Sequence, residues 1–348
     1  MGLKPPNRDS LKSTWPTDKS QWTLNHRIIH LFNAYPLPPG TQPPVFAKTD
    51  PVPYLIEWRN HVWVLFHAST PLLVHQLILT LGRIQSLPLA AVVLLYSFAF
   101  NWTVVGQIRA AARLGLEIGY LDGDVHARDG VPDVGVDQVV ASLWKMTGSR
   151  MVAAVLLSYD GTAPAASLLD MKWLAKLWVQ IGVYGIVLDF WFYIYHRGMH
   201  DIPALWKFHR THHLTKHPNM LLTAYADHAQ EFVDMVCIPL ATWYTFRAAG
   251  WWVCQQYVTF TEVLGHSGLR AYGTPPSTMT WLLRMMGMEL LVEDHDLHHR
   301  VGWRKMGGNY GKQTRRVECG EGNVDWGRGV YYELWTSTFL CHLFDDLG

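Results

Sequence analysis

Charged residues are scarce in this chain: they make up 16% of its 348 residues, whereas about 25% is usual for a soluble domain. Hydrophobic residues account for 49%. The 17 tryptophans and 15 tyrosines suit membrane interfaces, although an apolar core would also hold them. The formal net charge of +1 provides no basic excess that would attract nucleic acid. The composition therefore favours a membrane protein without a nucleic-acid partner.

Cysteine is also rare, and its spacing excludes two kinds of motif. The four cysteines are scattered, without a CxxC pair or a spacing typical of disulfides, so they do not fix the redox compartment. No HExxH motif is present, which removes the usual pattern of a zinc protease. The first 20 residues are polar and contain none of the apolar core of a signal peptide.

The apolar segments begin after a polar, proline-rich region, residues 1–60. Two stretches, 62–81 and 87–105, approach the roughly 20 residues that span a bilayer. The segment 106–150 is more polar. We expect it to form loops and short helices, as a soluble insert in an N-terminal membrane region of residues 61–172.

A third apolar stretch, residues 173–195, runs without proline into a histidine-rich segment. Residues 232–246 and 250–265 follow as shorter apolar legs. Each is about 22–24 Å long as a helix, less than the roughly 30 Å of the hydrocarbon core, and we expect a re-entrant or tilted hairpin. The basic residues Lys207 and Lys216 favour the cytosolic side. The prediction is an all-α membrane protein with about four membrane-entering helices or hairpins and a cytosolic, histidine-rich helical cap.

The histidines of this chain cluster in one part of the sequence. Eleven of its 18 histidines fall between positions 196 and 299, and eight of these have spacings that place side chains on one helical face. They form three sets: His196 and His200; His209, His212 and His213; and His295, His298 and His299. A single pair would be an ordinary surface or core feature. Three repeats of ligand spacing predict a metal centre.

Three further residues are candidates for the same site. Asp189 lies two turns before His196 on one face of the expected helix, where an intramembrane carboxylate is costly and usually functional. We expect it either to orient a histidine or to pair with Arg197 or another part of the chain. Glu262 and His266, spaced i, i+4 at the end of the second leg, form another possible ligand pair.

The types of candidate ligand limit which metals the site can bind. Many imidazoles with few carboxylates suit zinc, copper or iron better than calcium or magnesium. A catalytic zinc site usually has three protein ligands and an open position, so eight to ten histidines are too many for one such site and enough for two metals. Two irons that activate dioxygen against an unactivated C–H bond are the interpretation that uses all three sets.

Several motifs resemble the fatty acid hydroxylase/sterol desaturase superfamily of membrane di-iron oxygenases. They are DFWFYIYHRGMH at 189–200, LWKFHRTHH at 205–213, AYADHAQE at 224–231, HSG at 266–268, HDLHH at 295–299 and NYGKQ at 309–313. The resemblance covers about residues 173–314, as a catalytic domain. It implies a multi-pass enzyme of the endoplasmic-reticulum membrane whose active site faces the cytosol. It also implies dioxygen as oxidant and cytochrome b5 or a similar protein as electron donor.

The resemblance implies two Fe ions, with zinc as a substitute in purified protein. Nine histidines carry over as ligands: His196, His200, His209, His212, His213, His266, His295, His298 and His299. His217 and His228 are weaker candidates. Some members have a histidine where this chain has Glu262, so the ligands of the second metal remain open.

The resemblance implies hydroxylation or desaturation of a lipid-like substrate: a sterol, a fatty acyl chain, or a terpenoid or polyketide metabolite. Both reactions begin with the same C–H abstraction, and hydroxylation is the prediction. Desaturation, and a family member with impaired catalysis, are the alternatives. The second alternative is suggested by residues 315–348, a tail that departs from the family pattern. The family usually has a Trp-Asp pair soon after the NYGK segment, whereas this chain has Asp325-Trp326, in the reverse order and later in the sequence.

Overall fold

The computed structural model describes residues 7–32, 41–47, 49–159, 164–248, 250–301, 303 and 308–315. Within these residues the regular structure is helical, and extended pairing is limited to two isolated bridges, Tyr54 with Tyr272 and Tyr120 with Leu269. The predicted all-α class is confirmed. The tail predicted to diverge, residues 315–348, lies outside the described residues except for Arg315.

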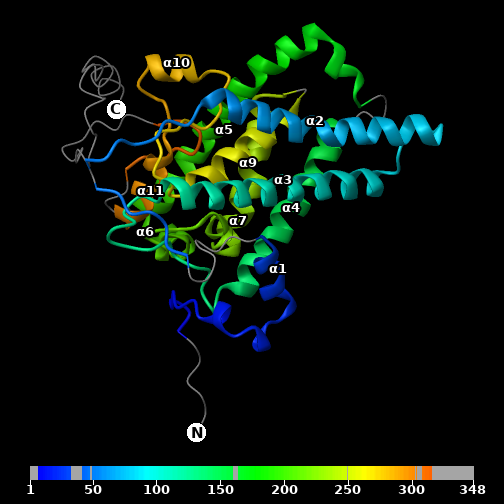
Figure 1. Cartoon of the computed structure of the whole chain (residues 1–348). Helices are drawn as coiled ribbons and strands as arrows, with labels where there is room; N and C mark the ends of the chain where they lie inside the picture. The colour runs from blue at the N-terminus through cyan, green and yellow to red at the C-terminus, as the bar shows by residue number, and fades with distance from the viewer. Residues whose placement is uncertain are drawn as a thin grey trace.

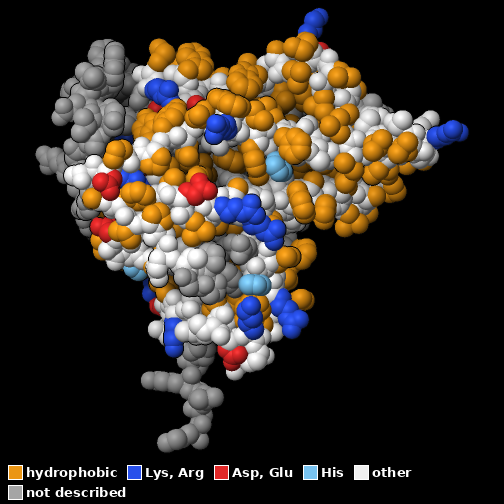
Figure 2. Space-filling model, in the orientation of Figure 1, with side chains coloured by type: hydrophobic (Ala, Val, Ile, Leu, Met, Phe, Trp, Pro, Cys, Tyr) orange, Lys and Arg blue, Asp and Glu red, His pale blue; other side chains and the backbone are white. Residues whose placement is uncertain are grey.

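Four helices are long and apolar enough to cross a membrane: α2 (Glu57–Gly82), α3 (Leu89–Ile118), α4 (Val136–Ser158) and α5 (Met171–Asp201). α2 and α3 contact each other and project together from the body of the protein (Figure 1). Figure 2 shows that hydrophobic side chains cover most of the visible surface over this projection. An apolar outer surface on long helices is the pattern of a multi-pass membrane protein.

The prediction of loops and short helices for residues 106–150 is wrong. α3 continues to Ile118 and α4 begins at Val136, so that irregular structure is confined to the segment between them. The charges that suggested a soluble insert gather in that segment, while Arg150 of α4 is buried and paired inside the protein. α4 is therefore one of the four long apolar helices.

α5 carries the third apolar stretch directly into the first histidine set, as predicted. The side chain of Asp170 caps its start by accepting hydrogen bonds from the backbone N–H groups of Lys172 and Trp173. The helix ends before Ile202, which is extended (φ −93°, ψ 112°), because a residue that precedes a proline avoids the helical conformation. His196 and His200 thus lie in the last turns of α5.

The two shorter legs are helical. The first begins at the last residue of α7 (His228–Phe232) and contains a π-helical turn (Val233–Cys237) and α8 (Ile238–Thr245), and the second is α9 (Trp251–Gly265). Every residue of α9 is buried, and the helix contacts α2, α3, α4, α5 and α11 (Val292–Val301). α9 is the central helix of the protein rather than an element whose side faces lipid.

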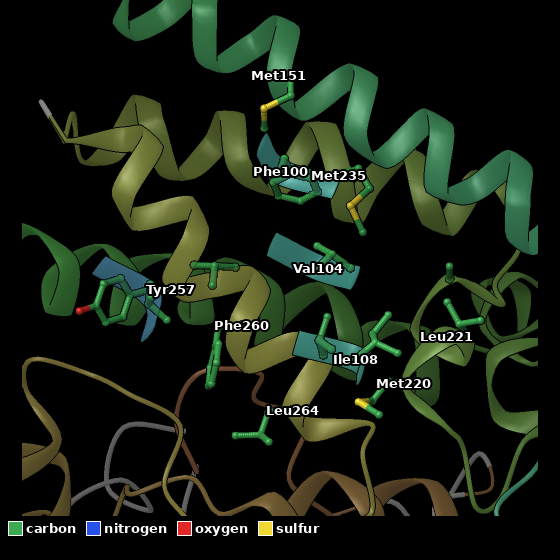
Figure 3. Packing of buried hydrophobic residues seen from close by; sticks show 14 of the residues in the cluster. Phe100, Val104, Ile108, Met151, Met220, Leu221, Met235, Tyr257, Phe260 and Leu264 are labelled. Carbon is green, nitrogen blue, oxygen red and sulfur yellow. The ribbon is translucent and has the colours of Figure 1, made fainter. Parts of the chain in front are cut away.

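The apolar core surrounds α9. Figure 3 shows Phe100 and Val104 of α3, Met151 of α4 and Phe260 of α9 in this core. The remaining helices, α1 (Leu24–Phe32), α6 (Pro203–His209) and α10 (Thr280–Met285), are short. Because α9 holds fixed contacts on all sides, its end at His266 is a rigid position for a ligand.

Candidate metal centre

Nine buried histidines meet in two groups, and these are the nine that the sequence predicted as ligands. Within each group, all ligand atoms lie within 4.8 Å of one another. The first group contains His196, His200, His209, His213 and His298, and the second contains His212, His266, His295 and His299. The three sequence sets therefore converge on one place in the fold.

Each HxxHH set is divided between the two groups. His209 and His213, four residues apart, belong to the first group, whereas His212 belongs to the second. α11 shows the reverse division, because the i, i+4 pair His295 and His299 joins the second group and His298 the first. Residues i+3 and i+4 of a helix lie on either side of residue i, about 100° apart around the axis, so the two can reach different groups and one short motif serves both.

The Nε2 atoms face one another within each group. In the first group they are 2.8 Å apart for His196 and His209, 3.1 Å for His200 and His213, and 3.1 Å for His213 and His298. In the second group they are 3.0 Å apart for His266 and His295, and 3.4 Å for His212 and His266.

The opposite ring nitrogen fixes the tautomer of five histidines. Nδ1 lies next to a backbone carbonyl oxygen in His196 (Tyr310, 2.9 Å), His212 (Tyr225, 3.3 Å), His266 (Glu262, 2.8 Å), His298 (Gly308, 2.9 Å) and His299 (Thr215, 3.1 Å). A carbonyl only accepts, so Nδ1 carries the proton and the Nε2 lone pair is free. Lone pairs that converge at about 3 Å repel unless a cation lies among them, and the donor set therefore fits metal ions.

His209 differs in that a side chain holds its Nδ1. The Oε1 atom of Gln230 lies 3.0 Å from it, and the amide nitrogen of Gln230 donates to Asp234 at 3.3 Å. Gln230 belongs to α7, and Asp234 to the π-helical turn that follows. The segment that precedes the first predicted leg thus orients a ligand of the first group.

Burial keeps the imidazoles in the form that binds metals. Desolvation lowers the pKa of His209 to about 3, and those of His266 and His298 to about 4. A neutral imidazole offers a lone pair, whereas an imidazolium does not. These three side chains are therefore ready to bind a metal at neutral pH.

Glu262 belongs to neither group. Its carboxylate lies 2.9 and 3.0 Å from Nη2 of Arg150, and 2.8 Å from Nζ of Lys312. The side chains of Glu262 and Arg150 are almost fully buried. Glu262 approaches the centre through its backbone, because its carbonyl accepts the Nδ1 proton of His266.

The carboxylate of Asp189 pairs with another part of the chain, which is one of the two roles expected for it. It accepts hydrogen bonds from the backbone N–H groups of residues 312–314 and from the hydroxyl of Thr314. The same segment contains Tyr310, whose carbonyl accepts from His196. Asp189 thereby orients His196 through this segment, while Arg197 pairs with Asp201 at 3.1 Å.

The two weaker candidates lie apart from both groups. The ring of His217 lies 4.1 Å from that of His126, and burial lowers the pKa of His217 to about 4. The side chain of His228 is exposed, with Nδ1 3.1 Å from Glu231 and 3.0 Å from Lys145. Neither offers a donor atom to the two histidine groups.

Sequence reasoning missed three residues that support the centre: Arg150, Gln230 and Lys312. Arg150 directly precedes the apolar run MVAAVLL, and a cation within a membrane segment usually pairs with another polar or charged group. The sequence therefore indicates that Arg150 has a partner, but it does not show which residue the partner is. Gln230 and Lys312 lie within motifs that the resemblance covered, but nothing in their spacing indicates what they contact.

Comparison with known proteins points in one direction. A family model described as "Fatty acid hydroxylase" matches residues 181–318. A curated relative, "Fatty acid hydroxylase vlmA" from a Lecanicillium species, is 41% identical over 323 residues, which cover 84% of this chain and 88% of the relative. No solved structure matches.

Proposed function

Because this chain belongs to the fatty acid hydroxylase family, we propose that it is a membrane di-iron oxygenase that hydroxylates an unactivated C–H bond of a lipid-like substrate with dioxygen. The observation that carries the proposal is the pair of histidine groups, with five and four donors. Two groups of this size suit two metal ions, and imidazole donors suit iron as well as zinc. Residues 173–314 are proposed as the catalytic domain.

Iron, when bound, would supply the activation of dioxygen. The chain's own residues have three tasks. The nine imidazoles would hold the metals in a site closed to bulk water, the carbonyls of Tyr310 and Gly308 keep Nδ1 of two ligands protonated, and Asp189 fixes the segment that provides those carbonyls. The nine histidines are buried, which limits water at the site.

A fatty acyl chain is the substrate class that we propose first, because the relative carries "fatty acid hydroxylase" as its name. The same name favours hydroxylation over desaturation. Against a catalytically impaired member stands the complete set of nine clustered histidines.

We further propose that the centre faces the cytosol from the endoplasmic-reticulum membrane and receives electrons from cytochrome b5 or a similar donor. The basic residues Lys207, Arg210 and Lys216 flank the second histidine set in the sequence, and basic segments next to membrane helices favour the cytosolic side. The Nζ atom of Lys216 lies 3.3 Å from the carbonyl oxygen of His299, so the second and third histidine sets share one face.

The proposal is tested by metal content and by product. Purified protein should hold close to two transition metals per chain, with iron in active preparations and zinc after overexpression. Cells that express the chain should accumulate hydroxylated fatty acids, detected by mass spectrometry, and a His200→Ala, His213→Ala double variant should not. One metal or none in folded protein would contradict the dimetal centre, and desaturated products would replace hydroxylation by desaturation.

A further inference from the structure

Two tryptophans lie between the protein surface and the first histidine group. Trp206 of α6 is buried, and its ring centroid lies 5.2 Å from that of His200 and 5.7 Å from that of His213. Trp303, which follows α11, is 42% exposed, and its ring lies 5.1 Å from that of Trp206 in an edge-to-face arrangement. Two successive ring contacts therefore connect the solvent with two candidate ligands.

The second histidine group has different neighbours. In the part of the chain that the structure describes, the rings of this group contact only other histidine rings. The tryptophan pair is thus specific to the first group. The two helices next to these tryptophans, α6 and α11, lie at the end of the protein opposite the projection of α2 and α3 (Figure 1). A partner in the aqueous phase can approach this end, because the projection is the part suited to the bilayer.

Cations flank the exposed ring of Trp303. The Nζ atom of Lys216 lies 4.9 Å from the ring centre, and the central guanidinium carbon of Arg210 lies 5.9 Å from it. Lys207 of α6 is exposed. Arg210 also pairs with Asp9 at 2.6 Å, whereas neither lysine forms an ion pair with a described residue. The surface around Trp303 therefore carries positive charge and suits an acidic partner.

A buried oxygenase centre needs electrons from outside the chain. Hydroxylation of a C–H bond by dioxygen consumes two electrons and two protons and releases one water molecule. Protein electron carriers dock briefly, through small interfaces whose charges are complementary. Electron tunnelling slows steeply with distance, so rings in contact between the surface and a buried ligand shorten each gap that the electron must cross.

We propose that an acidic one-electron carrier docks on the basic surface around Trp303, and that Trp303 and Trp206 conduct its electrons to the first histidine group. The need for electrons rests on the proposed function. In each transfer one electron leaves the reduced carrier and reduces one ferric ion held by the first group to ferrous. The two rings bridge the transfer without changing their own oxidation state, and no bond forms or breaks.

Binding of the carrier is measured first, on zinc-loaded full chain in nanodiscs, which cannot turn over. The soluble haem domain of cytochrome b5 is the probe. Its affinity should fall as salt rises, because the cations at this surface are exposed to solvent. Trp303→Leu should weaken binding about tenfold, as expected for a tryptophan at the centre of an interface. Trp281→Leu is the matched control, because Trp281 of α10 is 64% exposed and lies outside the tryptophan pair.

Reduction of the iron-loaded protein then tests the route. Reduced probe is mixed with it by stopped flow, without dioxygen or substrate, and the haem absorbance reports the transfer. At saturating probe, Trp206→Leu should bind as the wild type does and accept electrons more slowly, whereas Trp206→Phe, which keeps a ring, should recover most of the rate. If Trp206→Leu loses metal, Trp303→Leu against Trp303→Phe makes the same comparison.

Three results would overturn the inference. One is a wild-type protein that the probe does not reduce. Another is wild-type reduction rates in metal-loaded Trp206→Leu and Trp303→Leu. The third is probe binding that neither salt nor Trp303→Leu weakens.

The outcomes separate this inference from the proposed function. If the tryptophan variants slow reduction but expressing cells make no hydroxylated fatty acid, the electron route stands and the proposed function falls. If hydroxylated fatty acid forms and both leucine variants are reduced at the wild-type rate, the function stands and the electron route falls.

Discussion

Arg150 of α4 and Glu262 of α9 form a buried ion pair, with one guanidinium nitrogen 2.9 and 3.0 Å from the two carboxylate oxygens. Lys312 adds a second cation at 2.8 Å from the same carboxylate. Glu262 stands four residues before His266, as His196 stands four before His200. Its spacing would suit a fifth donor of the second group. Its carboxylate instead balances the charges of Arg150 and Lys312.

Glu262→Gln should destabilise the protein while leaving the metal in place. It leaves Arg150 and Lys312 buried without an anion, and breaking a buried pair typically costs about 3–5 kcal/mol. Thermal unfolding of the metal-loaded protein should show the loss, and the folded fraction should keep close to two metals per chain. A folded Glu262→Gln protein that loses one metal would instead identify the carboxylate as a ligand.

The Glu262→His variant tests whether Glu262 acts as a counter-ion or as a metal ligand. An imidazole would offer a metal-binding donor at this position, but it would not neutralise the two cations. We expect an unfolding temperature as low as that of Glu262→Gln, with no gain in metal content. Recovery of wild-type stability in this variant would contradict the assignment of Glu262 as a counter-ion.

Asp189→Asn should impair the first histidine group. The amide has one acceptor oxygen in place of two, so the segment around residues 312–314 loses part of its anchor and His196 loses its fixed orientation. Loss of such a supporting contact typically costs about 10- to 100-fold in metal affinity or activity. Chelator-induced metal release measures the effect. Asp201→Asn, which removes only the exposed partner of Arg197, should release metal at the wild-type rate.

Gln230→Leu should weaken the hold on His209, because its Nδ1 proton would lose its acceptor. Gln230→Glu keeps an acceptor oxygen for His209 but loses the amide donor to Asp234, so it should retain metal better than Gln230→Leu and less well than the wild type. Metal content after dialysis against a chelator compares the two variants. A role in packing alone would give the opposite order, since leucine fits a buried position better than a charged carboxylate.

Lys216 and Arg300 should be on the same side of the membrane, and Lys172 on the other. Lys172 stands at the start of α5, whose 31 residues extend about 46 Å and exceed the roughly 30 Å hydrocarbon core. Single cysteines at the three positions, labelled with a membrane-impermeant maleimide in sealed microsomes, measure this. Labelling of Lys216→Cys and Arg300→Cys from opposite sides would break the shared site.

The sequence by itself indicated which residues form the two candidate histidine groups. Neutral imidazole is recognisable by type, and spacings of three and four residues place side chains together on a helical turn, which marks eight of the nine histidines; His266 is added by its position and by the resemblance to the family. The apolar run before His196 likewise determined α5, because its length and the proline at 203 mark where that helix ends.

Only the tertiary structure decided how those residues are divided and supported. The split of each HxxHH set between two groups depends on where α5, α9 and α11 converge, and no local spacing contains that. The prediction for residues 106–150 is wrong because a charged residue looks the same in the sequence whether it lies in a solvated loop or, like Arg150, in a buried ion pair. Glu262 and Asp189 acquire their partners from α4 and from residues 312–314, contacts between distant parts of the chain that only packing creates.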